Sequence, residues 1–249
     1  MISVIVCSID PAKFAAVKAM YGRVMGNTPW ELIGIHDAKS MCEGYMRGVA
    51  LSRGQTLIFC HDDVEVISDG FAGKVLSHLE QFDLIGVAGT TRLCGDVWLA
   101  SLPPHVFGQV ATDDAAGVLW VNIFGVPRRT TGHIQGLDGM FLATRRSTFE
   151  KVRFDPVTFD GFHCYDLDFS FAAFNAGLRC GVVNDINLLH SHVSIYDEVW
   201  AKYNQRFAQK WSSRLWPSPM KSFTWTLIPV ASRAEAVEIM NPAYWDDKP

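Results

Sequence analysis

The chain has 249 residues, of which 49% are hydrophobic and 19% are charged, an ordinary composition for a globular protein with a substantial core. This length is enough for one large α/β domain or for two small ones. The formal net charge of −4 excludes a broad basic surface for nucleic acid or for an anionic membrane. A phosphate-bearing ligand would therefore have to be held locally, by backbone amides, a few basic side chains or a metal ion.

The cysteines and the first residues bear on the compartment. The six cysteines are scattered, and no two of them have the C-x-x-C spacing of a zinc site or a redox motif. The first ten residues, MISVIVCSID, lack the basic and long apolar regions of a signal peptide. No apolar run approaches the roughly 20 residues that a membrane span requires. We therefore expect a reduced, cytoplasmic protein without a membrane span.

The first 90 residues alternate short apolar runs with helical patterns. Ser40 and Glu43 form an S-x-x-E capping box at the start of one helix, and Gly54 suits its end. This alternation indicates a parallel sheet covered by helices on both faces. Strands are predicted at residues 2–7, 31–35, 57–60 and 84–88, and helices at 11–21, from 40 to about 53, and at 70–79.

The pattern changes after Gly89. Residues 89–136 are rich in glycine, proline and short aromatic runs and predict β-hairpins and loops without a clear helix. The segments that follow predict a strand in GMFLATRR, a helix in YDLDFSFAAFNAG that ends at Gly177, a strand in CGVV, and an amphipathic helix at about 196–210.

Three polar residues come directly after the buried strand at 57–60, in the stretch TLIFCHDDVEV. In open α/β sheets, ligands bind beyond the carboxyl ends of the strands. If the chain stays extended, His61 and Asp63 share one side and Asp62 takes the other. A carboxylate placed there could hold Mg²⁺ or Mn²⁺. The alternative is a turn in which an aspartate only caps the next element.

A second acidic pair, Asp166 and Asp168, opens the helix in YDLDFSFAAFNAG. Residues two apart on a helix lie roughly 200° apart, so the two carboxylates cannot face one site. Asp166, nearer the loop, is predicted to be reactive, and its neighbour to brace the helix N-terminus. His190 and His192 follow another apolar run, and neutral imidazole is a suitable ligand for Mn²⁺.

Taken in order, these stretches resemble the GT-A nucleotide-diphospho-sugar transferases, specifically the family-2-like glycosyltransferases. ISVIVCSID looks like the first nucleotide-binding strand and its loop, and LIFCHDDVEV resembles the strand that ends in a D-x-D-type motif. The segment from GLDGMFLATRR to FNAG is similar to the acceptor-side segment. HVS followed by EVWAKYNQRFAQKW is similar to the closing features of one subgroup. The resemblance covers most of residues 1–212.

The resemblance implies a GT-A (Rossmann-like) α/β fold, with a mixed, mostly parallel sheet flanked by helices in a single domain. Residues 1–90 would be the nucleotide-binding half, 91–212 the acceptor half, and 213–249 a tail that packs on the domain. It also implies a metal site in which Asp63 holds Mn²⁺ or Mg²⁺, with His192 or His190 as a further ligand. The other donor-side residues implied are His61 and Asp62, against the ribose or a phosphate, and Ser8 and Asp37, in the nucleoside pocket.

The same resemblance implies transfer of a sugar from a nucleotide-diphosphate donor to a hydroxyl of a glycan or another acceptor. The nucleotide expected first is UDP. Asp166 would be the general base, and Asp138 and Asp168 would lie on the acceptor side. A hydroxyl has a pKa far above 7, so a positioned carboxylate has to take its proton as attack proceeds. Direct attack assisted by one base inverts the anomeric centre.

Three positions depart from the family pattern, and they keep a second hypothesis open. His61 stands where aspartate is usual, Tyr165 precedes Asp166 where glutamate is usual, and Met46 follows Tyr45 where asparagine is usual. A relative that binds nucleotide sugars without turnover is therefore the alternative. A His-Asp phosphohydrolase is disfavoured because its HD pair lies on a helix. A Rossmann dehydrogenase is disfavoured because CSIDPAKF has no glycine.

Overall fold

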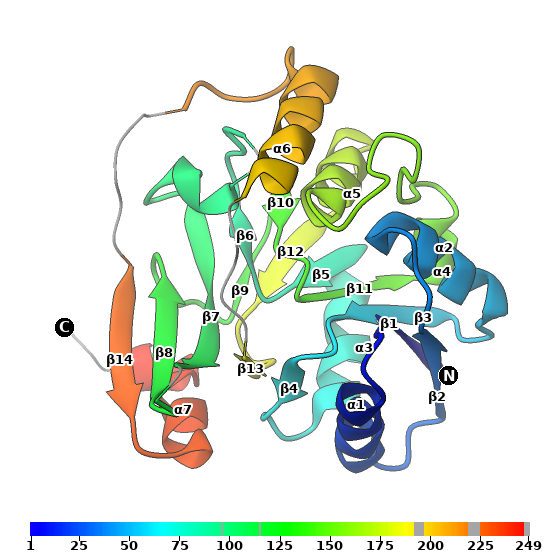
Figure 1. Cartoon of the computed structure of the whole chain (residues 1–249). Helices are drawn as coiled ribbons and strands as arrows, with labels where there is room; N and C mark the ends of the chain where they lie inside the picture. Colours follow the sequence, from blue (N-terminus) through cyan, green and yellow to red (C-terminus); the bar gives the residue numbers. More distant parts are fainter. Residues whose placement is uncertain (96, 115, 192–196, 219–224, 247–249) are drawn as a thin grey trace.

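The computed structural model describes residues 1–95, 97–114, 116–191, 197–218 and 225–246. The predicted ligand His192 lies outside the described residues. Two sheets form the body of the molecule, and helices cover the first of them (Figure 1). In the described part of the chain, none of the helices has both the length and the apolar character needed to cross a bilayer.

The first sheet is mixed. Strand β1 pairs in parallel with β2 and β3, and β12 pairs in parallel with β5. Strand β11 enters between β3 and β5 and is antiparallel to both. The predicted α/β class and mixed sheet are confirmed, with parallel pairing interrupted at β11. In spatial order the strands are β2 (Trp30–Ile35), β1 (Ile2–Cys7), β3 (Thr56–Cys60), β11 (Phe141–Arg145), β5 (Leu84–Gly86), β12 (Cys180–Val183) and β9 (Thr130–Thr131).

The antiparallel entry of β11 decides where the polar residues meet. Because β1 and β3 run in parallel, with Val6 opposite Cys60, their carboxyl ends lie at one edge of the sheet. Strand β11 starts at that edge, with Phe141 opposite Cys60. The residues before β11 therefore lie beside those after β3, and the amide of His61 donates to the carbonyl of Met140 at 3.2 Å.

The second sheet contains much of the segment that the sequence predicts as hairpins and loops. Strands β7 and β8 form an antiparallel hairpin, and β14 pairs with the outer side of β8. A short 3₁₀ helix at Trp98–Ser101 is an addition to the prediction. The strands are β10 (Gly136–Leu137), β6 (Ala88–Thr90), β7 (Val106–Asp113), β13 (Leu188–His190) and β4 (Val64–Val66), with β8 (Leu119–Phe124) and β14 (Thr226–Val230) continuing from β7.

The run at 84–88, predicted as one strand, divides between the two sheets. Its first part is β5 in the first sheet, and β6 in the second sheet begins at Ala88. Val87, between them, is fully buried. Every residue from 84 to 88 is buried. The hydrophobic pattern therefore shows no break at Val87, where the chain crosses from the first sheet to the second.

Two of the helices that cover the first sheet begin at polar caps, of which Ser40 was predicted. Asp10 accepts hydrogen bonds from the amides of Ala12 and Lys13, and Ser40 accepts from the amide of Glu43. Helix α2 packs on β1 and β2, α3 on β11 and β5, and α5 on β12 and β10. The helices are α1 (Pro11–Val24), α2 (Met41–Leu51), α3 (Phe71–Gln81), α4 (Arg146–Phe149), α5 (Tyr165–Asn175), α6 (Glu198–Trp211), α7 (Arg233–Ile239) and α8 (Ala243–Asp246).

An aromatic cluster packs against β3 near its carboxyl end. Phe59 packs on Tyr45 at 5.0 Å and on Phe154 at 5.0 Å, and Phe154 packs on Phe169 of α5 at 4.3 Å between ring centroids. Large rings buried together contribute both apolar area and fixed geometry. This cluster joins β3 to α5, the two elements that carry the acidic motifs.

Candidate active site

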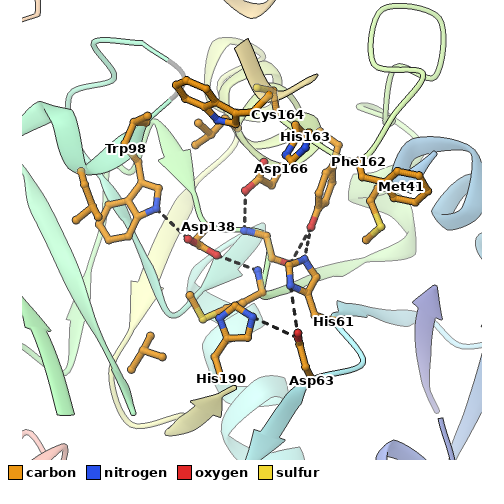
Figure 2. A pocket seen from close by; sticks show the side chains of 18 of the residues that line it. Met41, His61, Asp63, Trp98, Asp138, Phe162, His163, Cys164, Asp166 and His190 are labelled. Carbon is orange, nitrogen blue, oxygen red and sulfur yellow. Dashed lines mark hydrogen bonds and ion pairs between the residues drawn. The ribbon is translucent and has the colours of Figure 1, made fainter. Parts of the chain in front are cut away.

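A cavity of about 490 Å³ opens at the edge where β1 and β3 end and β11 begins (Figure 2). Its wall includes residues from the turn after β3, from the segment before β11, from the start of α5 and from the end of β13. The structure thus brings two separate sequence motifs into one cavity. The predicted site residues that line it are His61, Asp62, Asp63, Asp138, Asp166 and His190.

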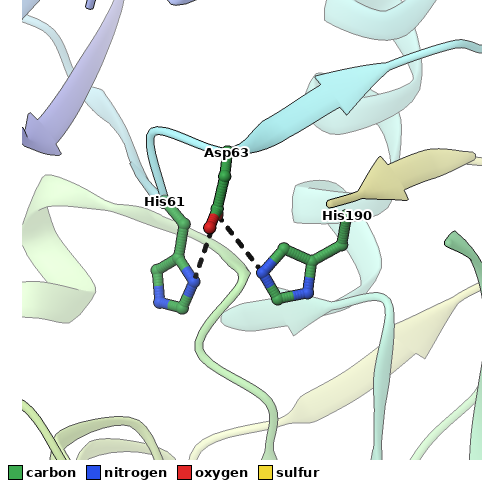
Figure 3. A group of neighbouring side chains, drawn as sticks. All are labelled: His61, Asp63 and His190. Atoms are coloured by element: carbon green, nitrogen blue, oxygen red, sulfur yellow. Dashed lines mark ion pairs between the residues drawn. The ribbon is translucent and has the colours of Figure 1, made fainter. Parts of the chain in front are cut away.

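One wall of the cavity carries His61, Asp63 and His190 (Figure 3). His190 ends β13, which pairs with β4 so that His190 lies opposite Val64. The carboxylate oxygen Oδ1 of Asp63 lies 3.3 Å from Nε2 of His190 and 4.0 Å from Nδ1 of His61. Burial acts to raise the pKa of Asp63, but the hydrogen bond from His190 and the charges of both histidines hold it well below its usual range.

These three side chains fit a divalent cation. Their potential ligand atoms all lie within 4.8 Å of one another. Two ligands bound to one ion at about 2.2 Å are at most about 4.4 Å apart, so small side-chain rotations bring the three atoms to a common centre. Two imidazoles with one carboxylate suit Mn²⁺ and other transition metals better than Mg²⁺, which prefers oxygen ligands.

Asp62 and Asp63 form a turn between β3 and β4, and not the extended chain that the alternation assumed, and the carboxylate of Asp62 is directed to the end of β1. Its Oδ2 accepts a hydrogen bond of 2.7 Å from the hydroxyl of Ser8, and its Oδ1 lies 3.7 Å from the ammonium of Lys13. Ser8 is buried at the end of β1. The contact therefore ties together the two strand ends that were predicted to bind the nucleotide.

The structure does not bring Asp37 to this cavity. Its side chain is 80% exposed and pairs with the guanidinium of Arg47 on α2. It lies after β2, at the border of the first sheet, whereas the cavity lies beyond β3 and β11. A position after a strand is therefore not sufficient to place a side chain in the site.

Asp166 projects into the cavity from the start of α5. Its Oδ2 accepts a hydrogen bond of 2.8 Å from the amide of Gly139. Burial and the neighbouring carboxylate of Asp138 raise the pKa of Asp166 to about 7, against the opposing effect of backbone amides. A carboxylate with this pKa is suited to taking a proton at neutral pH.

Asp138 lies beside Asp166 and is held by two donors. Its Oδ1 accepts from the amide of Met140 at 3.0 Å, and its Oδ2 accepts from the indole of Trp98 at 3.0 Å. The consecutive amides of Gly139 and Met140 thus hold two carboxylates side by side. The site needs glycine at 139, because a Cβ there would lie 2.3 Å from the hydroxyl of Tyr165 and 2.8 Å from the Cβ of Asp166.

Asp168 corrects one sequence expectation. As helical spacing predicts, it diverges from Asp166, but it does not line the cavity. Its carboxylate is buried and meets the ammonium of Lys210 at 2.8 Å and the indole of Trp211 at 2.8 Å. Both partners lie on α6, so Asp168 joins α6 to α5 instead of lying on the acceptor side.

Sequence reasoning missed the contacts between the two motifs. The hydroxyl of Tyr165 lies 2.6 Å from Nε2 of His61, and the indole of Trp98 lies on Asp138. The only signal in the sequence is that Tyr165 stands where the family pattern has glutamate. Tyr165 and His61 are 104 positions apart in the sequence, so no local pattern could predict the hydrogen bond.

Comparison with known proteins identifies the fold and the family of this chain. The crystal structure of GalNAc-T7 with UDP, GalNAc and Mn²⁺ matches with a TM-score of 0.52, over 86% of this chain and 48% of that chain, at 11% identity. The fold is thus the GT-A fold expected from the sequence. Residues 3–211 match the family described as "Glycosyltransferase like family", and the chain belongs to this family.

One curated relative is closer in sequence. It is described as "ATP synthase subunits region ORF 6" of Fuscovulum blasticum, and it is 30% identical over 168 residues. The match covers 64% of this chain and 60% of the relative. The chain therefore spans less than two thirds of the length of this relative, and about half that of GalNAc-T7.

Proposed function

We propose that this protein is a metal-dependent, inverting glycosyltransferase that moves a sugar from a nucleotide-diphosphate donor to an acceptor hydroxyl. UDP is the nucleotide that we favour. The observation that carries the proposal is one cavity with a set of cation ligands on one wall and Asp166 on another. Family membership supports sugar transfer, and the Mn²⁺ and UDP of the GalNAc-T7 structure support the choice of cation and donor.

On the donor side, His61, Asp63 and His190 would hold the cation, with Mn²⁺ favoured over Mg²⁺ by the two imidazoles. When bound, this ion stabilises the charge that grows on the leaving diphosphate. The linked pair Ser8 and Asp62 would contact the ribose or a phosphate from the ends of β1 and β3. On this proposal His61 would be a cation ligand, and not the contact to the ribose or a phosphate that the resemblance implies.

On the acceptor side, Asp166 would take the proton of the attacking hydroxyl. Its pKa of about 7 leaves about half of the molecules ionised at neutral pH, and such a base contributes typically 10²–10⁴-fold to the rate. Both oxygens of Asp138 already accept hydrogen bonds, so Asp166 is the better proton acceptor. One base without a second nucleophile gives in-line attack and inversion.

The donor side and the acceptor side would come from different parts of the chain. We propose that residues 1–90 bind the nucleotide and that 91–212 supply most of the acceptor side, where Trp98, Phe162 and Trp200 line the cavity. The acceptor would be a glycan or another hydroxyl-bearing molecule. The six cysteines all lie in the described part of the chain and form no disulfide there, which suits a reducing compartment such as the cytoplasm.

The test combines donor binding with transfer. Calorimetry with UDP and Mn²⁺ should show that Asp63→Asn abolishes metal-dependent binding, whereas Asp166→Asn binds like wild type and loses transfer by about 10²–10⁴-fold. Asp37→Asn is the matched control, because it removes an exposed carboxylate at the same edge. NMR of the product gives its anomeric configuration. Metal-dependent binding that survives Asp63→Asn would refute the assignment of the cation site.

A nucleotide-sugar-binding relative without turnover is the alternative. It is favoured by the histidine and tyrosine at positions 61 and 165, where the family pattern has acidic residues. It predicts that wild type binds UDP-sugars with Mn²⁺ and neither transfers nor hydrolyses them. The same binding and product measurements distinguish the two functions.

A further inference from the structure

The hydroxyl of Tyr165 joins the two halves of the cavity. It lies 2.6 Å from Nε2 of His61 and 3.3 Å from the carbonyl oxygen of Gly139, to which it donates. The amide of the same Gly139 donates to Asp166. A single chain of contacts thus runs from the cation ligand His61 to the proposed base.

The hydrogen bond from Tyr165 to Gly139 favours one tautomer of His61. A carbonyl oxygen can only accept, and a tyrosine hydroxyl has one proton to donate. When that proton goes to Gly139, the oxygen of Tyr165 accepts from Nε2–H of His61. The other ring nitrogen, Nδ1, then carries the lone pair, and it is this nitrogen that faces Asp63 at 4.0 Å.

The position of the hydroxyl is fixed by packing. Tyr165 is only 4% exposed, and its ring packs on Tyr45 at 5.8 Å and on Phe154 at 6.2 Å between centroids. A Cβ at position 139 would lie 2.3 Å from the hydroxyl oxygen, so glycine there permits the close approach. The packing of the ring and the close contact with Gly139 hold the hydroxyl beside His61.

We propose that Tyr165 is a positioning residue that holds His61 in the Nε2–H tautomer, so that Nδ1 offers its lone pair to the divalent cation. The inference deepens the proposed function and rests on it for the presence of the cation. Histidines that bind metals generally donate their other N–H to a fixed acceptor, and loss of that acceptor typically lowers metal affinity by about 10–100-fold. Here the acceptor is a buried hydroxyl.

Two measurements test the proposal. The first is ¹⁵N NMR of the histidine side chains in metal-free wild type, with His61 assigned from the signal lost in His61→Asn. We expect the Nε2–H tautomer in wild type and a mixture in Tyr165→Phe. The second is the affinity for Mn²⁺ in the presence of UDP, followed by EPR of the free ion, which should fall by about 10–100-fold in Tyr165→Phe.

Tyr21→Phe is the matched control. Tyr21 is a buried tyrosine of α1 that packs on Trp30 and Phe71 and not on His61. Loss of the Tyr21 hydroxyl should change neither the tautomer of His61 nor the affinity for Mn²⁺. A general effect of removing a buried hydroxyl would instead lower the affinity of both variants alike.

The outcomes separate this inference from the proposed function. Wild type that binds no Mn²⁺ with UDP overturns the cation site itself. Wild type that binds Mn²⁺ while Tyr165→Phe binds it equally well overturns only the role of Tyr165. An Nδ1–H tautomer of His61 in wild type would also overturn that role, and this result does not depend on whether Tyr165→Phe folds.

Discussion

Replacing Asp138 by asparagine should move the pH dependence of the reaction to lower pH. Asp138 and Asp166 are held side by side by consecutive amides. Burial is the first cause of the raised pKa of Asp166, and the charge of Asp138 is the second. Asp138→Asn removes the second cause and leaves the first. The pKa of Asp166 should therefore fall below about 7 and stay above that of an ordinary aspartate.

The size of the effect follows from the ionised fraction of Asp166. An acid with a pKa of about 7 is about one tenth ionised at pH 6. A shift of about one unit, the usual scale of such perturbations, makes it about half ionised at that pH. Relative to its own plateau at high pH, the variant should thus be about fivefold more active at pH 6 than wild type.

The assay is kcat/KM for sugar transfer between pH 5 and 9 at saturating Mn²⁺, because this parameter reports the pKa of the free enzyme's base. The asparagine loses one of the two hydrogen bonds made by Asp138, so the midpoint is compared and not the plateau. Asp37→Asn, an exposed carboxylate, should leave the midpoint unchanged. An unchanged or higher midpoint in Asp138→Asn would refute the coupling between the two carboxylates.

Two further changes act on stability. The raised pKa of Asp166 means that its carboxyl group holds a proton more tightly in the folded chain than in the unfolded chain. The contribution of Asp166 to the free energy of unfolding therefore falls as the pH rises from about 4 to about 7. Denaturant unfolding should show Asp166→Asn more stable than wild type by roughly 1–2 kcal/mol at pH 8 and similar at pH 4; a difference independent of pH would contradict this. Lys210→Met leaves the carboxylate of Asp168 buried without its cation and should cost about 3 kcal/mol. Lys202→Met, exposed on the same helix, should cost less than about 0.5 kcal/mol, and equal losses would rule out the buried pair as the cause.

The local elements of the fold could be predicted, because they depend on neighbours in sequence. The helix caps Asp10 and Ser40 and the all-buried run of β3 lie within a few residues of the elements that they define. Pairing between strands could not be predicted in the same way. The antiparallel entry of β11 and the crossing at Val87 depend on partners far along the chain, and the uniform burial of 84–88 conceals the crossing.

The candidate site divides along the same line. His61 and Asp63 lie together as predicted, although a turn at residues 62–63 and not an extended chain places them there. The divergence of Asp166 and Asp168 follows from helical spacing. Asp168 and Lys210 are 42 positions apart in the sequence. Nothing near Asp168 therefore indicated that its carboxylate pairs with a lysine. Asp37 shows that the end of a strand predicts an edge of the sheet and not a cavity.

The most direct test of the cation site is a crystal grown with Mn²⁺ and UDP and measured at the manganese absorption edge. We expect an anomalous peak within bonding distance of His61, Asp63 and His190, with the diphosphate on the ion and its terminal end directed into the cavity that holds Asp166. A manganese peak elsewhere, with these three side chains making no contact with the ion, would contradict it.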